Sequence, residues 1–162
     1  MASNRIQISH ARQEDRDAIL AFSKDAHEES IFKDIPFSER KFDRFFQDAL
    51  QNQEFYFGIK ATLGGNVLGV LFCARGGYFV GEGAKVASVN VINISKDIRS
   101  AMLGGKVAVR LVREVEKWAR SKGVEVILFY VTSGETLSRT DRFFRKMGMT
   151  TLGGSYGIRL NY

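Results

Sequence analysis

The chain has 162 residues, 44% of them hydrophobic, and a formal net charge of +6, which predicts one globular domain over residues 1–162. No window approaches the roughly 18 consecutive apolar residues of a membrane span, so a membrane protein is excluded. The single cysteine and two histidines exclude an internal disulfide, and a metal site is not expected.

The positive charge favours an anionic partner, such as a phosphorylated cofactor, an acidic surface or a nucleic acid. Acidic residues interrupt every basic stretch, so nucleic-acid binding is the weakest of these interpretations. The N-terminal segment is polar and lacks the apolar core of a secretory signal, which predicts a cytoplasmic location.

The first half of the chain predicts a strand, two helices and a hairpin. Ile6 and Ile8 alternate with polar residues, as in a half-buried strand, and Pro36 separates two segments with helical apolar spacing. Two β-rich segments flank a glycine-containing turn, which is typical of an antiparallel hairpin. The predicted elements are a strand over 5–11, helices over 12–30 and 37–51, and strands over 54–61 and 67–75.

The second half alternates strands and helices after a glycine-rich loop over 76–83. The nearly continuous apolar run over 124–131 is typical of a strand covered on both faces. The predicted elements are a strand over 85–95, a helix from about Lys106 to Lys122, a strand over 124–131, a helix over 138–148 and a β-rich tail over 150–162. This order predicts a mixed α/β sheet with a right-handed strand–helix–strand unit.

Gly104 and Gly105 stand between a strand that we expect to end near Ile98 and the helix that follows. A glycine pair here indicates a sharp turn or a close backbone approach. Because a helix N-terminus has free amides and a positive dipole end, the junction is a candidate pyrophosphate site. A tight turn without a ligand explains the pair equally well. Neither the Walker pattern nor G-x-G-x-x-G is present, which argues against a nucleotide-binding loop of either type.

The order of the elements and the segment from Ile98 to Gly123 resemble the GNAT acyltransferase superfamily, whose cofactor is acetyl-coenzyme A. The family's signature, V-x-P-x-x-R-G-x-G-x-G/A, follows its fourth strand and holds the cofactor's pyrophosphate. The resemblance implies that the cofactor-binding residues are Ile98, Ser100, Leu103, Gly104, Gly105, Lys106, Val107 and Ala108. Leu103 replaces the family's arginine and Lys106 its inner glycine, so Lys106 or Arg99 is the candidate for the missing positive charge.

Other segments extend this resemblance over nearly the whole chain. Residues 116–131 and 142–149 are similar to the family's helix-to-strand and F-Y-x-K-x-G-F passages, and residues 26–42 to phage-encoded members. The resemblance implies a single-domain α+β fold, with a mixed, mostly antiparallel sheet, one parallel strand–helix–strand unit and flanking helices. It also implies acetyl transfer to an unknown amine, which is a protein lysine, an N-terminus or a small molecule. The family places the acceptor between the first two helices and the loop over 76–83.

The catalytic residues are left open by the sequence. The family's proton-donating tyrosine falls on Phe144, which leaves Tyr130 and Tyr156 as candidates by residue type. The candidates for a base are Asp97, Glu28, Glu29 and His27, each of which also suits a purely structural role. Cys73, within an apolar strand, is interpreted as a core residue.

The departures at Leu103, Lys106 and Phe144 also support a second hypothesis. In it, the chain is a catalytically silent member of the same fold that serves in a virion or binds a host protein. The tail permits a homodimer through strand pairing without requiring one.

Overall fold

The structure is a computed structural model that describes residues 5–132 and 137–160. Its elements, in chain order, are β1 (Gln7–His10), the short 3₁₀ turn η1 (Gln13–Asp15), α1 (Arg16–Glu28), α2 (Glu39–Gln51), β2 (Tyr56–Leu63), β3 (Asn66–Gly77), β4 (Lys85–Ile94), α3 (Lys96–Arg99), α4 (Met102–Ser121), β5 (Val126–Phe129) and α5 (Leu137–Lys146). Within the described part of the chain, no helix is both long and apolar enough to cross a membrane.

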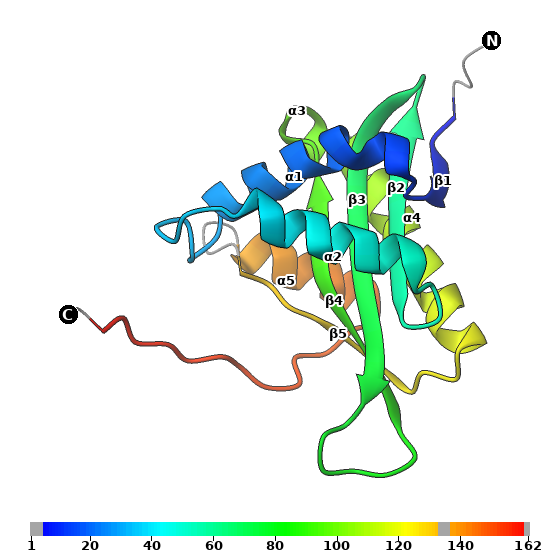
Figure 1. Ribbon diagram of the computed structural model, residues 1–162, viewed down its shortest axis with the longest axis vertical. Helices are drawn as coiled ribbons and strands as arrows, with labels where there is room; N and C mark the ends of the chain where they lie inside the picture. Colours follow the sequence, from blue (N-terminus) through cyan, green and yellow to red (C-terminus); the bar gives the residue numbers. More distant parts are fainter. Residues whose placement is uncertain (1–4, 133–136, 161–162) are drawn as a thin grey trace.

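The five strands form one sheet in the order β1-β2-β3-β4-β5, in which only β4 and β5 run parallel. Figure 1 shows α1 and α2 crossing one face of this sheet and α4 lying behind the other. The central strand β3 is buried on both faces: Val70 and Phe72 contact the α1–α2 layer, and Leu71 and Cys73 the α4 layer. The fold is therefore a single-domain α+β fold with a mixed sheet and flanking helices, as the sequence predicts.

The first half of the chain follows the sequence closely. Ser38 caps α2 by accepting a hydrogen bond from the Lys41 amide, and the apolar stripe of that helix is buried on the sheet. Gly64 and Gly65 form the β2–β3 turn with positive φ angles of 57° and 87°, which glycine adopts without strain. Cys73 lies in the core, where burial raises the pKa of its thiol to about 12.

The predicted boundaries at the glycine pair are wrong. The strand ends at Ile94, not near Ile98, and the helix begins at Met102, not Lys106, because residues 96–99 form the additional short helix α3. The guanidinium of Arg99 donates two hydrogen bonds to the Ile94 carbonyl, which closes this extra turn against the end of the strand. Both glycines consequently lie within the first turn of α4.

Two predictions about the C-terminal region are also wrong. Residues 149–160 form no strand, and Figure 1 shows this segment leaving the body of the molecule after α5. Without a strand beside it, β5 is the edge of the described sheet, and none of its four residues is buried. An apolar strand composition normally indicates cover on both faces, so β5 has the sequence of an interior strand at an edge position.

Candidate functional site

A break in strand pairing opens the sheet between β4 and β5. Phe72 of β3 pairs with Val91 and Cys73 with Val89, so Asn90 is an extra residue, as in a β-bulge. β5 pairs with β4 only from Val86 to Val89, whereas β4 continues to Ile94. Beyond the bulge the two parallel strands diverge and leave a gap between them.

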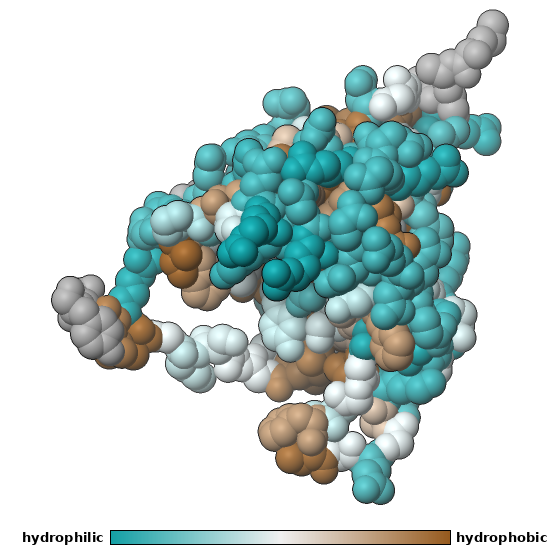
Figure 2. Space-filling model, in the orientation of Figure 1, coloured by the Kyte–Doolittle hydropathy of each residue, from teal (hydrophilic) through white to brown (hydrophobic). Residues whose placement is uncertain are grey.

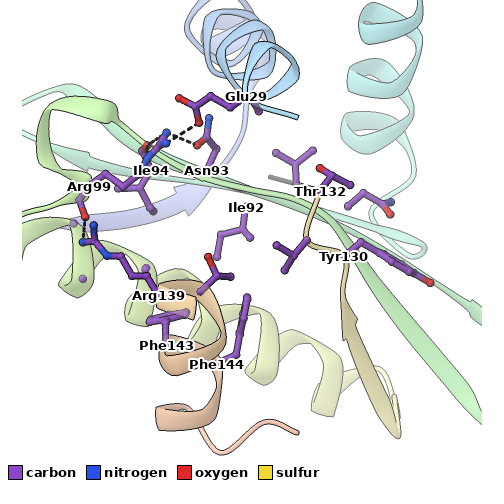
Figure 3. A pocket seen from close by; sticks show the side chains of 18 of the residues that line it. Glu29, Ile92, Asn93, Ile94, Arg99, Tyr130, Thr132, Arg139, Phe143 and Phe144 are labelled. Atoms are coloured by element: carbon purple, nitrogen blue, oxygen red, sulfur yellow. Dashed lines mark hydrogen bonds and ion pairs between the residues drawn. The ribbon is translucent and has the colours of Figure 1, made fainter. Parts of the chain in front are cut away.

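A cavity of about 420 Å³ occupies this gap, a size suited to a small ligand. Its walls come from the end of α1, the second half of β4, the first turns of α4 and α5, and the segment after β5 (Figure 3). Asn90 and Asn93 on β4 and Thr132 after β5 supply polar groups, while Phe143 and Phe144 supply an apolar wall. The site therefore combines an apolar wall with polar groups from β4 and from the segment after β5.

Gly104 and Gly105 have different surroundings at the start of α4. A Cβ atom on Gly104 would lie 2.3 Å from the Ile98 carbonyl oxygen, so only glycine lets α3 and α4 approach this closely. A Cβ atom on Gly105 would meet nothing within 4 Å, and this residue borders the cavity. The first amides of a helix have no intrahelical partner, and the N-cap residue Ala101 provides no side-chain acceptor. The Gly105 amide donates to the Ala101 carbonyl oxygen at 3.4 Å, so the donors that the start of α4 offers beside the cavity belong to the residues before Gly105.

Arg99 ties three elements together beside the cavity. Its guanidinium donates to Glu29 Oε2 after α1 (2.7 Å), to Asn93 Oδ1 (3.0 Å) and to the Ile94 carbonyl (2.9 and 3.1 Å). The Asn93 amide in turn donates to the Phe22 carbonyl of α1 at 3.1 Å. Figure 3 shows this network at the Arg99 end of the cavity. Its hydrogen bonds fix the angle between α1 and the end of β4.

Glu29 is held in its charged form by this network. Partial burial acts to raise the pKa of its carboxyl, but hydrogen bonds and charge interactions with Arg99 and Lys96 outweigh burial and lower the pKa below its ordinary 4.5. The Lys96 ammonium lies 3.3 Å from Glu29 Oε1. Because Arg99 and Lys96 both form ion pairs with this carboxylate, Glu29 is a poor candidate for a catalytic base.

A second arginine reaches the same junction from α5. Arg139 donates from Nη2 to the Arg99 carbonyl oxygen at 2.6 Å and lines the cavity. The ring of Phe144 lies 4.9 Å from that of Phe129, which packs α5 against β5. Arg139 and the two asparagines of β4 are site residues that the sequence analysis missed. The signal for Asn90 and Asn93 is that each is a polar residue between apolar neighbours in the strand.

Three of the eight cofactor-binding residues implied by the resemblance line the cavity: Gly104, Gly105 and Ala108. Ile98 and Leu103 pack against the core, Val107 is fully buried, and Ser100 and Lys106 are exposed. The other five, which do not line it, are Ile98, Ser100, Leu103, Lys106 and Val107. Of the two candidate cations, Arg99 lines the cavity and Lys106 does not.

The candidate catalytic residues are only partly brought together. Glu29 and Tyr130 line the cavity, whereas Asp97, Glu28, His27 and Tyr156 do not. His27 instead contacts the Ile35 carbonyl through Nε2, at 2.6 Å. In Figure 3 the Tyr130 ring extends away from Arg99 and Phe144. The loop over 76–83 also lies outside the cavity lining, at the far end of the β3–β4 hairpin.

The model of the acetyltransferase (GNAT) family matches residues 19–149. The chain therefore belongs to the GNAT acetyltransferase family.

Several solved structures share the fold. A transcriptional regulator from Bacillus halodurans C-125 has a TM-score of 0.75 at 14% identity, covering 96% of this chain and 100% of that one. AAC(6')-Iy in complex with the bisubstrate analog CoA-S-monomethyl-acetylneamine has a TM-score of 0.75 at 12% identity, covering 98% and 99%. Glucosamine-6-phosphate N-acetyltransferase from Arabidopsis thaliana has a TM-score of 0.70 at 14% identity, covering 97% and 99%. No curated protein matches the sequence. At these identities the likeness shows the fold alone.

Alanine at the two glycines is expected to change stability in opposite directions. We expect Gly104→Ala to lower the free energy of unfolding by about 1–3 kcal/mol, because its Cβ atom collides with the backbone of Ile98. Gly105→Ala has open space and gains about 0.5–1 kcal/mol of helix propensity. Urea unfolding of both variants measures the difference, and equal effects would contradict the separate roles assigned to the two glycines.

Acidification is expected to remove the contribution of Glu29 to stability. Its pKa is lower in the folded chain than the ordinary 4.5, so the contribution is complete above pH 4.5 and is lost as the pH falls through the folded pKa. Glu29→Gln should cost about 1 kcal/mol at pH 7, and the difference from the parent protein should shrink below pH 4.5. Urea unfolding across this range tests the prediction, with the exposed neighbour Glu28→Gln as control. A difference that stays constant with pH would show that Glu29 acts through packing rather than charge.

Proposed function

We propose that the protein is an acetyl-CoA-dependent N-acetyltransferase. The observation that carries the proposal is the first turn of α4 at the wall of a 420 Å³ cavity, where Gly105 leaves the backbone open to a ligand. Free amides at a helix N-terminus suit a pyrophosphate, and the apolar wall of the cavity suits an uncharged acyl-bearing arm. Family membership and the fold shared with a CoA-analog complex support the same cofactor class.

The end of β4 at Ile94 also suggests a different placement of the family signature. With its first position on Ile94, the signature's arginine falls on Arg99 and its final small residue on Gly104, whereas Ser100 and Met102 replace the two inner glycines. We prefer this placement because the signature follows the fourth strand in the family. Arg99 then acts through Glu29 and the Ile94 carbonyl to shape the loop, and the amides at the start of α4 hold the phosphates.

Acetyl transfer to an amine also assigns a role to the backbone at the bulge of β4. Acetyl-CoA supplies an acetyl thioester; the amine nitrogen of the acceptor forms a bond to the carbonyl carbon, the carbon–sulfur bond breaks, and the amine proton leaves while the thiolate gains a proton. A bulge leaves its extra residue outside the regular ladder, so the backbone near Asn90 is our candidate donor for the carbonyl oxygen.

The acceptor must supply a neutral amine to this site. Among the described residues that line the cavity, the titratable side chains are Glu29, Arg99, Tyr130 and Arg139. Glu29 is occupied by two cations, and neither arginine is a base near neutral pH. An acceptor that is already partly neutral therefore fits best, which favours an N-terminal α-amino group over a lysine side chain.

Binding of acetyl-CoA is expected to depend on the open backbone at Gly105. In calorimetric titration the parent protein should bind with micromolar affinity, and Gly105→Glu should abolish binding because its carboxylate repels the pyrophosphate. Gly77→Glu is the matched control, since it adds the same charge at an exposed position on the β3–β4 hairpin. Equal binding by both variants would exclude the start of α4 as the phosphate site, and no binding by the parent would overturn the proposal.

Acetylation is expected to follow the neutral fraction of the acceptor amine. At pH 7 roughly 300-fold more of an α-amino group than of a lysine side chain is neutral. We therefore expect a peptide with a free N-terminus and no lysine to be acetylated faster than an N-terminally blocked lysine peptide, with a rate that rises up to about pH 8. Release of CoA thiol, followed by mass spectrometry of the peptides, measures both rates. Faster acetylation of the blocked lysine peptide would show that the site contains a base.

The silent module stays the second candidate because Phe144, which packs on Phe129, stands where the family has a tyrosine. Under this hypothesis the protein either binds acetyl-CoA without releasing CoA thiol or does not bind acetyl-CoA at all. Phage origin, a cytoplasmic or virion location and acetyl rather than another acyl group remain predictions.

A further inference from the structure

The outer face of α4 carries a row of positive charges. A lysine or arginine recurs at every third or fourth position from 106 to 120, a spacing that keeps side chains on one side of a helix. At about 100° per residue they fall within a sector of about 80°, opposite the face that packs on the sheet, and the row is about 21 Å long. All of these residues are exposed. The members of this basic stripe are Lys106, Arg110, Arg113, Lys117 and Arg120.

The acidic residues of α4 lie beside the basic stripe rather than within it. Glu114 and Glu116 interrupt the cations along the chain, and such interruptions make nucleic-acid binding the weakest interpretation of the sequence. On the helix surface the two glutamates lie about 80° to either side of the middle of the stripe, and both are partly buried. The interruption therefore disappears when the helix forms.

Most of the charge of the basic stripe is not compensated within the chain. Lys117 pairs with Glu114 at 2.7 Å, and Arg110 donates to the Ile6 carbonyl, which is uncharged. Within residues 5–132 and 137–160, the other three cations of the stripe form no ion pair with a carboxylate. A row of cations with so little internal compensation attracts anions from outside the chain.

The helices on the other side of the sheet have a surface of mixed charge. Figure 2 shows hydrophilic residues over this α1–α2 face. On α2 the exposed cations Arg40 and Arg44 lie among the exposed acids Glu39 and Asp48, and Glu39 is also paired with Lys24. The uninterrupted row of cations is thus a feature of α4 and does not follow simply from the positive net charge of the chain.

We propose that the basic stripe of α4 binds the phosphate backbone of a double-stranded nucleic acid, without preference for base sequence. The phosphates of a duplex form lines of negative charge on its surface, and contacts to them carry no sequence information. Proteins bind single strands largely by stacking bases on exposed aromatic side chains. The aromatic residue of α4, Trp118, is buried in the core, so this helix offers charge without a stacking platform.

The basic stripe extends away from the proposed cofactor site. Lys106 follows Gly105 at the cavity wall. The last three cations, from Arg113 onward, lie about two to four turns further along α4 and do not line the cavity. These three side chains can therefore be changed without altering the cavity, so that binding of nucleic acid and binding of acetyl-CoA are separately testable.

The first test is fluorescence anisotropy of short labelled duplexes, one of DNA and one of RNA, titrated with the parent protein without acetyl-CoA. We expect a Kd in the micromolar range at low salt. With about four phosphate contacts, the affinity should fall about 150-fold between about 50 and 200 mM salt, a log–log slope of about −3.6. Tighter binding of one duplex would identify the natural form, whereas tighter binding of the matching single strand would overturn the assignment to a duplex.

The combined substitution Arg113→Gln, Lys117→Gln and Arg120→Gln tests the basic stripe itself. Glutamine is a good helix former, so the change removes three charges while retaining the helix. We expect duplex affinity to fall at least about tenfold at low salt and the slope to become shallower by about 2.7. Circular dichroism and urea unfolding check that the variant is folded, and acetyl-CoA binding by calorimetry should match that of the parent protein.

The matched control is Arg40→Gln combined with Lys41→Gln and Arg44→Gln, which removes the same charge from exposed positions of α2. We expect this variant to bind duplex nearly as the parent does. An equal loss in both variants would show that binding follows net charge and would overturn the proposal. A parent protein that binds no duplex at low salt also overturns it, and binding to phosphatidylserine vesicles would then assign the stripe to a lipid surface. Because acetyl-CoA is absent from the duplex titrations, either proposal can fail without the other.

Discussion

The divergence of β4 from β5 at Asn90 is the constraint on which the rest of the site depends. A parallel pair that stayed hydrogen-bonded to its end would leave no space between the strands, because neighbouring strands lie only about 4.8 Å apart. One extra residue stands in β4 where the pairing with β5 ends after Val89, and the following residues, 90–94, line the gap. The cavity therefore has its origin in the register of the β3–β4 pair, on the side of β4 away from β5.

The loop after β4 must then bring a helix N-terminus to the gap, and short-range packing accomplishes this. Arg99 holds the turn of α3 on the Ile94 carbonyl, and Gly104 lets α4 start almost in contact with the Ile98 carbonyl. The tight approach leaves the next residue, Gly105, on the open side. Gly104 is thus required by the close packing of α3 on α4, and Gly105 leaves space beside the cavity. These two roles explain why the helix contains adjacent glycines although each glycine lowers its stability.

The sequence predicted the layers better than the junctions. The helical stripe of α2, the β2–β3 turn and the apolar α4 face depend on local spacing and turn chemistry, and all of them appear in the structure. The sequence places the end of β4 about one helical turn too late along the chain. The true end depends on hydrogen bonds from Arg99 to the Ile94 carbonyl, and the spacing of apolar residues contains no sign of this contact. Arg139 was missed because its place at the cavity depends on the packing of α5, which becomes visible only in three dimensions. The unpaired tail was misjudged because alternation predicts a strand but does not identify its neighbour.

The charges at the junction limit how the site recognises an anion. Arg99, which lines the cavity, makes four hydrogen bonds to protein acceptors, and its charge is already compensated by Glu29. Releasing it toward a ligand would leave that carboxylate with Lys96 alone and would free the end of β4. In the proposed cofactor site, recognition of a phosphate therefore relies mainly on the amides at the start of α4, with Arg139, which donates to the Arg99 backbone carbonyl, as a cation that a ligand could recruit. Because backbone amides respond to the position of a charge rather than to side-chain identity, the proposed site is compatible with Ser100 and Met102 at the positions of the signature's inner glycines.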